Sequence, residues 1–321
     1  MNEVGLGHKI LFFLREVDAI VSNEPQMPVC FEIDASNSCQ NDCDFCMFAF
    51  HIKKNRVHLS RHNFIKAIWD MKDMGVRAIT FTGGGEPLMN PHIKDMVNIA
   101  HSFRFKIGLV TNGILLDKIM DDAHVFEYVR VSLDCATRET YYRTKHSHHF
   151  DRIIYNLKTL VDQRKTDVGL SFVITDDNRD EIDAFHDLAE SIGVDYAQVK
   201  PELKQCDMLA QTKDVDHNKF FVTERYNIDR DAEIACKIAG LIGVLNATGK
   251  VYYCCVHRGK SEFEIGDINT NSLNDIFSWR FKFKPNLKLC RTGSCRYMNY
   301  AKVYDKVKER RFKVLRHRRF I

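Results

Sequence analysis

The sequence predicts an α/β protein built on a parallel sheet, and two observations support this fold class. Segments with strand character alternate with segments of helical period along residues 29–199, as is typical of parallel sheets with helical crossovers. Cysteine-rich and glycine-rich motifs directly follow two of these strand segments, where parallel α/β folds gather their sites. The predicted strands are 29–34, 78–82, 106–111, 127–133, 168–174 and 195–199.

The segments around these strands carry apolar residues at helical spacing. An N-terminal helix is expected within residues 5–22, ahead of the first strand. Ser60 has the character of an N-cap, and the helix that it begins should end at Gly75. Further helices are predicted at 92–103, 115–123, 151–164 and 179–191.

Length and composition indicate an ordinary globular protein. The chain has 321 residues, a net charge of +4 and 45% hydrophobic residues, enough for one large domain and a smaller one. The apolar run Ile10–Leu14 is too short for a signal peptide, and no run approaches the ~20 apolar residues that cross a bilayer. We therefore expect a cytoplasmic protein with no membrane partner. An odd count of eleven cysteines argues against a disulfide framework.

A loop with three cysteines follows the first predicted strand. Cys39, Cys43 and Cys46 have the spacing Cys-x3-Cys-x2-Cys. Three thiolates this close can hold one metal centre, but they leave one iron of a four-iron cluster without a protein ligand. An open coordination position is where a metal site does chemistry. The alternative from spacing alone is a structural zinc site completed by His51 or His58.

A glycine run follows the second predicted strand. Consecutive glycines let a ligand approach the backbone, and the carboxylate that follows suits an ammonium group. On its own such a run is usually a turn. Together with the cysteine loop, and with Phe45 before the last cysteine, it resembles the radical S-adenosylmethionine (SAM) enzymes. The residues of the run are Thr82, Gly83, Gly84, Gly85 and Glu86.

This resemblance implies a partial (β/α)6 barrel that carries a [4Fe–4S] cluster on the three cysteines. It also implies that SAM binds the open iron and the glycine run. An external one-electron reductant such as flavodoxin or ferredoxin would reduce the cluster. SAM would then be cleaved to methionine and a 5′-deoxyadenosyl radical that takes a hydrogen atom from the substrate.

Polar residues at other strand ends are further candidates, with turn and cap chemistry as the alternative. The resemblance places Ser132 and Asp134 beside the SAM ribose. Asn112 is a further candidate for SAM binding, although its Thr-Asn-Gly context also suits a turn. Arg143 is predicted to meet the SAM carboxylate, with a surface role as the alternative. Lys200 follows the sixth strand and is a candidate catalytic residue.

A second set of cysteines lies in the C-terminal third. Its spacing, with a Gly-x4-Cys hairpin at Gly249, resembles the auxiliary-cluster domains called SPASM or twitch, which hold two clusters or one. Four cysteines saturate one [4Fe–4S] cluster, which favours the twitch type, although the closing pair is more widely spaced than usual. The predicted ligands are Cys236, Cys254, Cys290 and Cys295.

The remaining cysteines are interpreted mainly as buried packing. This applies to Cys30, Cys135 and Cys206. Cys255, beside a predicted ligand, is either packing or a functional thiol, and we favour packing.

The predicted organisation has five parts. The C-terminal part is basic with interleaved apolar residues, which favours an amphipathic helix with a solvated face over a nucleic-acid site. The parts are an N-terminal helical extension (1–27), the partial barrel (28–205), a linker or lid (206–235), a small α+β auxiliary-cluster domain (236–297) and a basic helix or tail (298–321).

The predicted function is that of a radical SAM oxidoreductase, a dehydrogenase of a small carbohydrate-like or natural-product substrate. In this hypothesis the auxiliary cluster accepts an electron from the substrate radical. The alternatives are an epimerase in which Cys255 returns a hydrogen atom, modification of a peptide or protein side chain, and a non-catalytic iron–sulfur or zinc protein. Only about 28 residues precede the first strand, which favours a small molecule over a peptide substrate.

Overall fold

The computed structural model describes residues 7–50, 56–202, 212, 214–216, 218–222, 226–227, 232–280, 290, 294–295 and 297–315. His51 and Cys206 lie outside this part of the chain, as does most of the predicted linker. Within the described part, no helix combines the length and the apolar character that a bilayer crossing needs.

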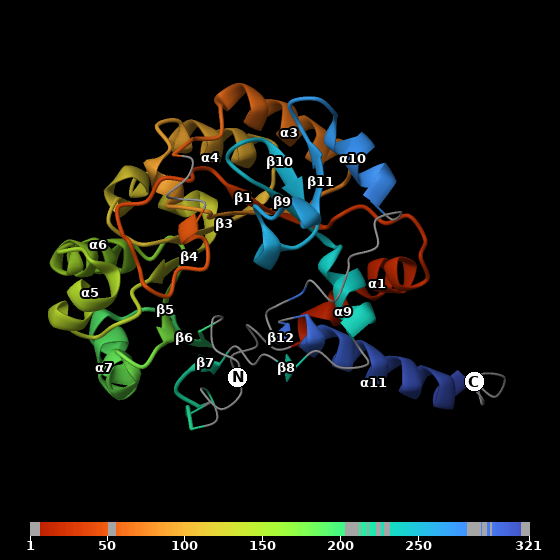
Figure 1. Cartoon of the computed structure of the whole chain (residues 1–321). Helices are drawn as coiled ribbons and strands as arrows, with labels where there is room; N and C mark the ends of the chain where they lie inside the picture. The colour runs from red at the N-terminus through yellow and green to blue at the C-terminus, as the bar shows by residue number, and fades with distance from the viewer. Residues whose placement is uncertain are drawn as a thin grey trace.

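A curved ten-stranded sheet is the centre of the fold (Figure 1). Its order is β11-β10-β9-β1-β2-β3-β4-β5-β6-β7, and strands β1 to β6 are parallel. The predicted α/β fold class, with the parallel core of a partial barrel, is therefore confirmed, and the predicted strand bounds hold to within two residues. The six strands are β1 (Cys30–Asp34), β2 (Ala78–Thr82), β3 (Lys106–Thr111), β4 (Phe126–Ser132), β5 (Asp167–Ile174) and β6 (Tyr196–Pro201).

Helices cover the outer side of this sheet (Figure 1). The first of these helices, α3, is capped as predicted, because the Ser60 side chain accepts a hydrogen bond of 3.1 Å from the backbone N–H of Asn63. Short 3-10 turns, η2 (Pro87–Met89) and η5 (Arg179–Glu181), lie ahead of two of the helices. The helices are α3 (Arg61–Asp73), α4 (Ile93–Ser102), α5 (Arg138–Lys145), α6 (Phe150–Gln163) and α7 (Ile182–Ile192).

The helix predicted at 115–123 is wrong. That segment forms two 3-10 turns, η3 (Leu116–Ile119) and η4 (Ala123–Val125). Leu116 and Ile119 are fully buried, so the apolar spacing that suggested a helix reflects a short connection tucked against the core.

Alternation along the strands separates an apolar face from a polar one. Phe81 points toward the helices, and its ring centroid lies 5.8 Å from that of Phe64 on α3. The neighbouring residues of the same strands, such as Glu32 and Thr80, pair in register on the opposite, concave face. The apolar core therefore lies between sheet and helices, while polar side chains remain available at the strand ends.

The C-terminal segment extends the same sheet. β9 (Ile242–Leu245) pairs in parallel with β1, and β10 (Lys250–Tyr252) and β11 (Glu264–Asp267) continue as antiparallel strands. The sheet thus runs across the boundaries predicted between barrel and auxiliary domain. The remaining elements are η1 (Gly7–Phe13), α1 (Leu14–Val21), β7 (Phe221–Val222), β8 (Tyr226–Asn227), α9 (Ala232–Ala239), η6 (Cys255–His257), η7 (Ser261–Phe263), α10 (Leu273–Arg280), β12 (Ser294–Cys295) and α11 (Met298–Leu315).

A second apolar cluster holds the terminal helices together. It joins Val17 of α1, Ile238 of α9, Val244 of β9 and Met298 of α11, all of them buried. This packing brings α1 and α11 beside two of the predicted auxiliary cysteines, Cys254 and Cys295.

Candidate functional site

A cavity of about 310 Å³ lies at the C-terminal ends of the parallel strands. Its wall contains the three cysteines of the first loop, Cys39, Cys43 and Cys46. It also contains Lys200 and, from the ends of β2, β3 and β4, the glycine run with Asn112, Ser132 and Asp134, but not Arg143. The fold therefore brings the two motifs together from positions about 40 residues apart in sequence.

The glycine run packs directly on the backbone that leads into the cysteine loop. The Glu86 N–H donates to the Ser38 carbonyl at 2.7 Å. A Cβ atom on Gly85 would lie 2.4 Å from that carbonyl oxygen, and one on Gly84 would lie 2.7 Å from Oδ1 of Asn37. Only glycine permits this approach, so the run is glycine-rich partly because two backbones meet here.

Glu86 is buried and held by three donors. Its Oε1 accepts hydrogen bonds from Thr111 Oγ1 at 2.6 Å and from the Leu88 N–H at 3.1 Å, and its Oε2 accepts one from the Asn112 N–H at 2.7 Å. Burial raises the pKa of Glu86 to about 6, although these hydrogen bonds oppose the shift. The result is a fixed carboxylate in the cavity wall that can bind a hydrogen-bond donor or a cation.

Asn112 makes the turn contacts considered for it, and its side chain also reaches the cysteine loop. Its Oδ1 accepts from the Ile114 N–H at 3.0 Å, which is turn chemistry, and Gly113 takes a φ of +84°. Its Nδ2 donates to Gln40 Oε1 at 3.1 Å and lies 3.8 Å from Cys39 Sγ. The turn therefore aims an amide at the cysteine loop.

The cysteine loop provides sulfur donors that suit an iron–sulfur cluster. Burial raises the pKa of Cys39 to about 11, and the Glu86 carboxylate adds to the shift. Burial also raises the pKa of Cys43 to about 12, although the Lys145 cation opposes it. Such thiols become thiolates only when a cationic centre compensates their charge. Three sulfurs that face one cavity fit a [4Fe–4S] cluster with one iron open to that cavity.

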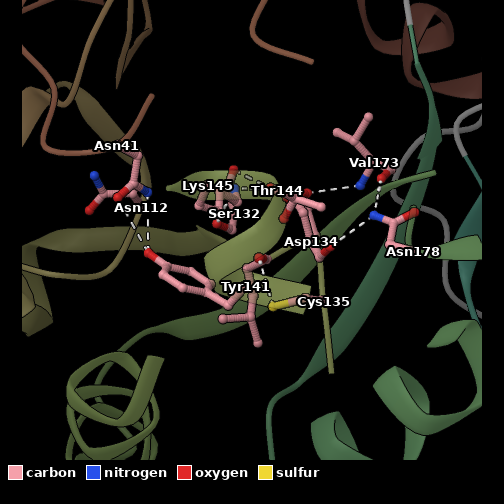
Figure 2. Close-up of polar contacts among 12 residues, drawn as sticks. Asn41, Asn112, Ser132, Asp134, Cys135, Tyr141, Thr144, Lys145, Val173 and Asn178 are labelled. Carbon is pink, nitrogen blue, oxygen red and sulfur yellow. Dashed lines mark hydrogen bonds and ion pairs between the residues drawn. The ribbon is translucent and has the colours of Figure 1, made fainter. Parts of the chain in front are cut away.

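Lys145 is a site residue that the sequence reasoning missed (Figure 2). Its ammonium pairs with the Asp134 carboxylate and donates to the Ser132 carbonyl at 3.2 Å. It also lies 5.0 Å from the centre of the Phe45 ring in the cysteine loop. Burial alone would lower the pKa of Lys145, but Asp134 and Cys43 raise it. A permanent cation therefore stands beside the loop, within the cavity wall.

Asp134 is occupied by protein contacts. Besides the Lys145 pair, its Oδ1 accepts from the Val173 N–H at 2.8 Å, and its backbone carbonyl accepts from Asn178 at 2.9 Å (Figure 2). Its φ of +61° is unusual for a residue other than glycine. These contacts favour a role in holding Lys145 over the predicted contact with a ribose. Ser132 Oγ, 3.3 Å from Ser171 Oγ, remains suited to that contact.

The cysteine loop is docked on the end of α5. The Asp42 N–H donates to the Lys145 carbonyl at 3.1 Å, and the Asp44 N–H donates to the Thr144 carbonyl at 3.2 Å. These bonds satisfy carbonyls that the last turn of a helix leaves unpaired. Backbone contacts thus fix the loop on the helix.

Arg143 lies away from the cavity, which corrects the prediction that it meets the SAM carboxylate. Its side chain is about half exposed and donates to the Asp177 carbonyl at 2.6 Å. On helix α5, Tyr141, Thr144 and Lys145 share the buried face at spacings of three and four residues, while Arg143 lies on the opposite face. The buried cation of this helix is therefore Lys145.

The auxiliary cysteines converge around η6. Cys254 directly precedes this turn and packs with Cys295 against the second apolar cluster. The pKa of Cys254 is raised by its hydrogen bond with Cys255, by burial and by the nearby Cys295. None of the described cysteines forms a disulfide.

The other two predicted auxiliary ligands lie near the same part of the chain. The backbone carbonyl of Cys236 on α9 accepts from the Tyr253 hydroxyl at 3.0 Å. The sulfur of Cys290 lies 3.4 Å from Nε2 of His257, which belongs to η6. Cys254, Cys290 and Cys295 thus lie close to η6, and α9 brings Cys236 near Tyr253, two residues before it.

Cys255 is packed away from the cavity. It is 5% exposed, belongs to the second apolar cluster, and its Sγ lies 3.5 Å from the Tyr297 hydroxyl. Cys135 is likewise buried, whereas Cys30 is half-buried beside the same cluster as Cys255. The placement of Cys255 favours the packing role over that of a hydrogen donor.

Two family models match the chain. One is described as the radical SAM superfamily and matches residues 33–189. The other is described as an iron–sulfur cluster-binding domain, SPASM, and matches residues 236–298. The two matches cover the cavity with its cysteine loop and the auxiliary cysteines, respectively.

Curated relatives are similar over part of the chain. A probable GTP 3′,8-cyclase of Saccharolobus islandicus is 27% identical over 165 residues, which cover 50% of this chain and 53% of the relative. An S-adenosylmethionine-dependent nucleotide dehydratase of Flammeovirga pacifica is 28% identical over 127 residues, covering 37% of this chain and 43% of the relative. The chain thus spans about half the length of these relatives or less.

Solved structures share the fold. Streptococcus suis SuiB bound to S-adenosylmethionine has a TM-score of 0.65 at 15% identity, covering 78% of this chain and 65% of SuiB. The structure of anSMEcpe with bound AdoMet has a TM-score of 0.57 at 14% identity, covering 90% of this chain and 98% of anSMEcpe. At such identities the likeness concerns the fold alone.

Proposed function

The chain belongs to the radical SAM superfamily and carries a SPASM domain, and from this premise we propose that it removes two hydrogen atoms from a small polar substrate. The radical SAM domain brings a [4Fe–4S] cluster and SAM as cofactors, and the SPASM domain brings auxiliary iron–sulfur chemistry. When bound, these cofactors supply a carbon-centred radical that abstracts a hydrogen atom. The protein's own residues bind the cofactors, orient the substrate and accept a proton.

We assign the cluster ligands to Cys39, Cys43 and Cys46, and the SAM site to the glycine run and Glu86. The buried Glu86 carboxylate suits the N–H groups of the amino group of the methionine part. Two of the three N–H groups of Lys145 serve Asp134 and the Ser132 carbonyl, which leaves one for the carboxylate of SAM. Ser132 is the candidate for the ribose, in place of Asp134.

The positions of Cys255 and its neighbour Cys254 favour dehydrogenation. Cys255 is buried in apolar packing, which leaves an epimerase without its hydrogen donor. Cys254 belongs to the auxiliary set, and the iron–sulfur cluster that this set would hold is a suitable electron acceptor. In the proposed reaction the substrate gives one hydrogen atom to the carbon radical and one electron to the auxiliary site. It gives one proton to a base at the cavity, for which Lys200 is our candidate.

The proposed organisation keeps the predicted ranges as functional units. Residues 28–205 would hold SAM and the substrate, and 236–297 the auxiliary cluster, joined by a shared sheet. Two curated relatives are named for reactions of nucleotides, and they support a small polar substrate as a class. An external one-electron donor would complete the reaction.

The test is an anaerobic assay of the reconstituted protein with candidate nucleotides and sugars in heavy water. Dehydrogenation gives a product that has lost two hydrogen atoms and carries no solvent deuterium. An isomeric product with one solvent deuterium, lost in Cys255→Ala, would establish epimerisation instead. If an added peptide is modified and none of the small molecules is, the substrate is a peptide.

A further inference from the structure

Arg258 connects the two cysteine sites through a fully buried guanidinium. It follows η6 and is 4% exposed. Its Nε donates to the Cys255 carbonyl at 2.8 Å, while its other nitrogens pair with Asp34 and Glu32 on β1. The side chain thus reaches from the turn that gathers the auxiliary cysteines to the strand that leads into the SAM-site loop.

The contact continues from Asp34 to the glycine run. Asp34 is buried and receives a backbone hydrogen bond from Gly84. A Cβ atom on Gly84 would lie 3.2 Å from Oδ2 of Asp34, which shows how closely the run approaches this carboxylate. Gly84 itself lines the cavity. One buried carboxylate therefore links Arg258 to the middle of the glycine run.

Arg258 also contacts a second residue that lines the cavity. Its guanidinium carbon lies 5.0 Å from the centre of the Phe48 ring. Phe48 follows Cys46 by two residues and lines the cavity. The same side chain is therefore in contact with the strand, the cysteine loop and, through Asp34, the glycine run.

The chemistry of arginine explains why this position needs that residue. A buried ion pair offsets its desolvation only when the geometry is good and the remaining donors are satisfied. The planar fork of Arg258 meets two carboxylates and one carbonyl at once, whereas a lysine ammonium is a point charge on a flexible stem. The fork fixes the distance between η6 and β1.

We propose that Arg258 is a positioning residue that couples SAM binding at the glycine run to the auxiliary cysteine site. The inference rests on the proposed function, since it takes the glycine run as the SAM site. Disturbing the η6 turn would shift Arg258, release Asp34 and loosen Gly84. Because coupling between sites is reciprocal, bound SAM would in turn stabilise the auxiliary site.

The experiment measures SAM affinity by equilibrium dialysis on the anaerobically reconstituted full chain, with iron content and EPR spectra recorded for every variant. Arg258→Lys keeps the charge and loses the fork. We expect it to bind SAM about tenfold more weakly at unchanged iron content, the size usual for residues that orient a site's ligands. Arg77→Lys, the same change at an exposed arginine paired with Glu16, is the matched control and should bind SAM normally.

A double-mutant cycle tests the coupling. Cys254→Ala, which removes an auxiliary ligand, should weaken SAM binding in the wild-type background but add little in the Arg258→Lys background. Additive effects would refute the coupling. Wild-type SAM affinity in Arg258→Lys would refute the positioning role while leaving the proposed function intact.

Failure of the wild-type protein to bind SAM would instead contradict the proposed function. If Arg258→Lys loses its iron, Asp34→Asn decides the matter, because it keeps the shape and removes only the charge that Arg258 meets. Weakened SAM binding with full iron content in Asp34→Asn supports the proposal, and wild-type affinity overturns it.

Discussion

The two cysteine sites are built in different ways. The cysteines of the SAM cavity lie in one loop, docked on helix α5 and on the glycine run through backbone hydrogen bonds. The auxiliary cysteines come from separate segments: Cys236 from α9, Cys254 from the residue before η6, Cys295 from β12, and Cys290 from outside these elements. Cys254 and Cys295 pack against the second apolar cluster. The first site is therefore shaped by the fold itself, whereas the second depends on segments that a cluster would tie together.

Replacing Cys39, Cys43 and Cys46 by alanine should have the largest effect. The variant should lose about four of about eight irons and form no 5′-deoxyadenosine, because the described residues of the cavity wall offer no other set of ligands. Iron analysis and chromatography of the SAM products provide the measurement. Continued cleavage of SAM would contradict the assignment of the first site.

Cys236→Ala should remove the other iron atoms and abolish oxidation of the substrate. Cleavage of SAM should continue at saturating SAM. Since a cluster would tie the auxiliary segments together, this variant should also lower the melting temperature more than the triple alanine variant does. A smaller drop in melting temperature than in the triple alanine variant would contradict the idea that the auxiliary site depends more on its cluster than the first site does.

Lys145→Met should destabilise the cluster-free protein by about 3–5 kcal/mol, because it leaves the Asp134 carboxylate buried without its cation. Chemical denaturation monitored by circular dichroism measures the change. Arg143→Gln is the control on the same helix, and its exposed pair with Asp177 should leave the unfolding midpoint unchanged. Equal effects of the two substitutions would show that the buried Lys145–Asp134 pair contributes no more to stability than the exposed Arg143–Asp177 pair.

SAM affinity should fall as the pH is lowered through about 6. Burial raises the pKa of Glu86 to about 6, so the carboxylate is charged above that pH and becomes neutral below it. A neutral acid accepts the N–H groups of the SAM amino group less strongly than a carboxylate does. We expect SAM affinity to fall by about tenfold, which corresponds to about 1.4 kcal/mol. Glu86→Gln should bind SAM weakly with no such pH dependence. A wild-type profile as flat as that of the glutamine variant would exclude this role.

The parts of the protein that local sequence specifies were predictable. The strands β1 to β6 could be recognised from short apolar runs, and both cavity motifs stand directly after a strand. Lys145 was missed although its signal is local: Thr137 caps a helix on which Tyr141, Thr144 and Lys145 share one face. A helical interpretation of that segment would have chosen Lys145 over Arg143 as the buried cation.

The contacts that join distant segments could not be inferred from the sequence. Arg258 and Asp34 are 224 residues apart, and no periodicity marks either as one of a pair. Likewise, nothing near residue 242 indicates that β9 pairs with β1 and makes one sheet of two predicted domains. Such pairings depend on the whole chain's packing and not on propensity within a window.

In the proposed SAM site, the SAM amino group binds the open iron of the first cluster inside this cavity. The direct measurement is electron–nuclear double resonance on the reduced protein with SAM labelled with nitrogen-15 at its amino group. We predict a strong coupling between that nitrogen and the cluster, present in the wild-type protein and absent in the triple cysteine variant. A wild-type protein that holds its cluster and binds SAM without any such coupling would contradict this binding mode.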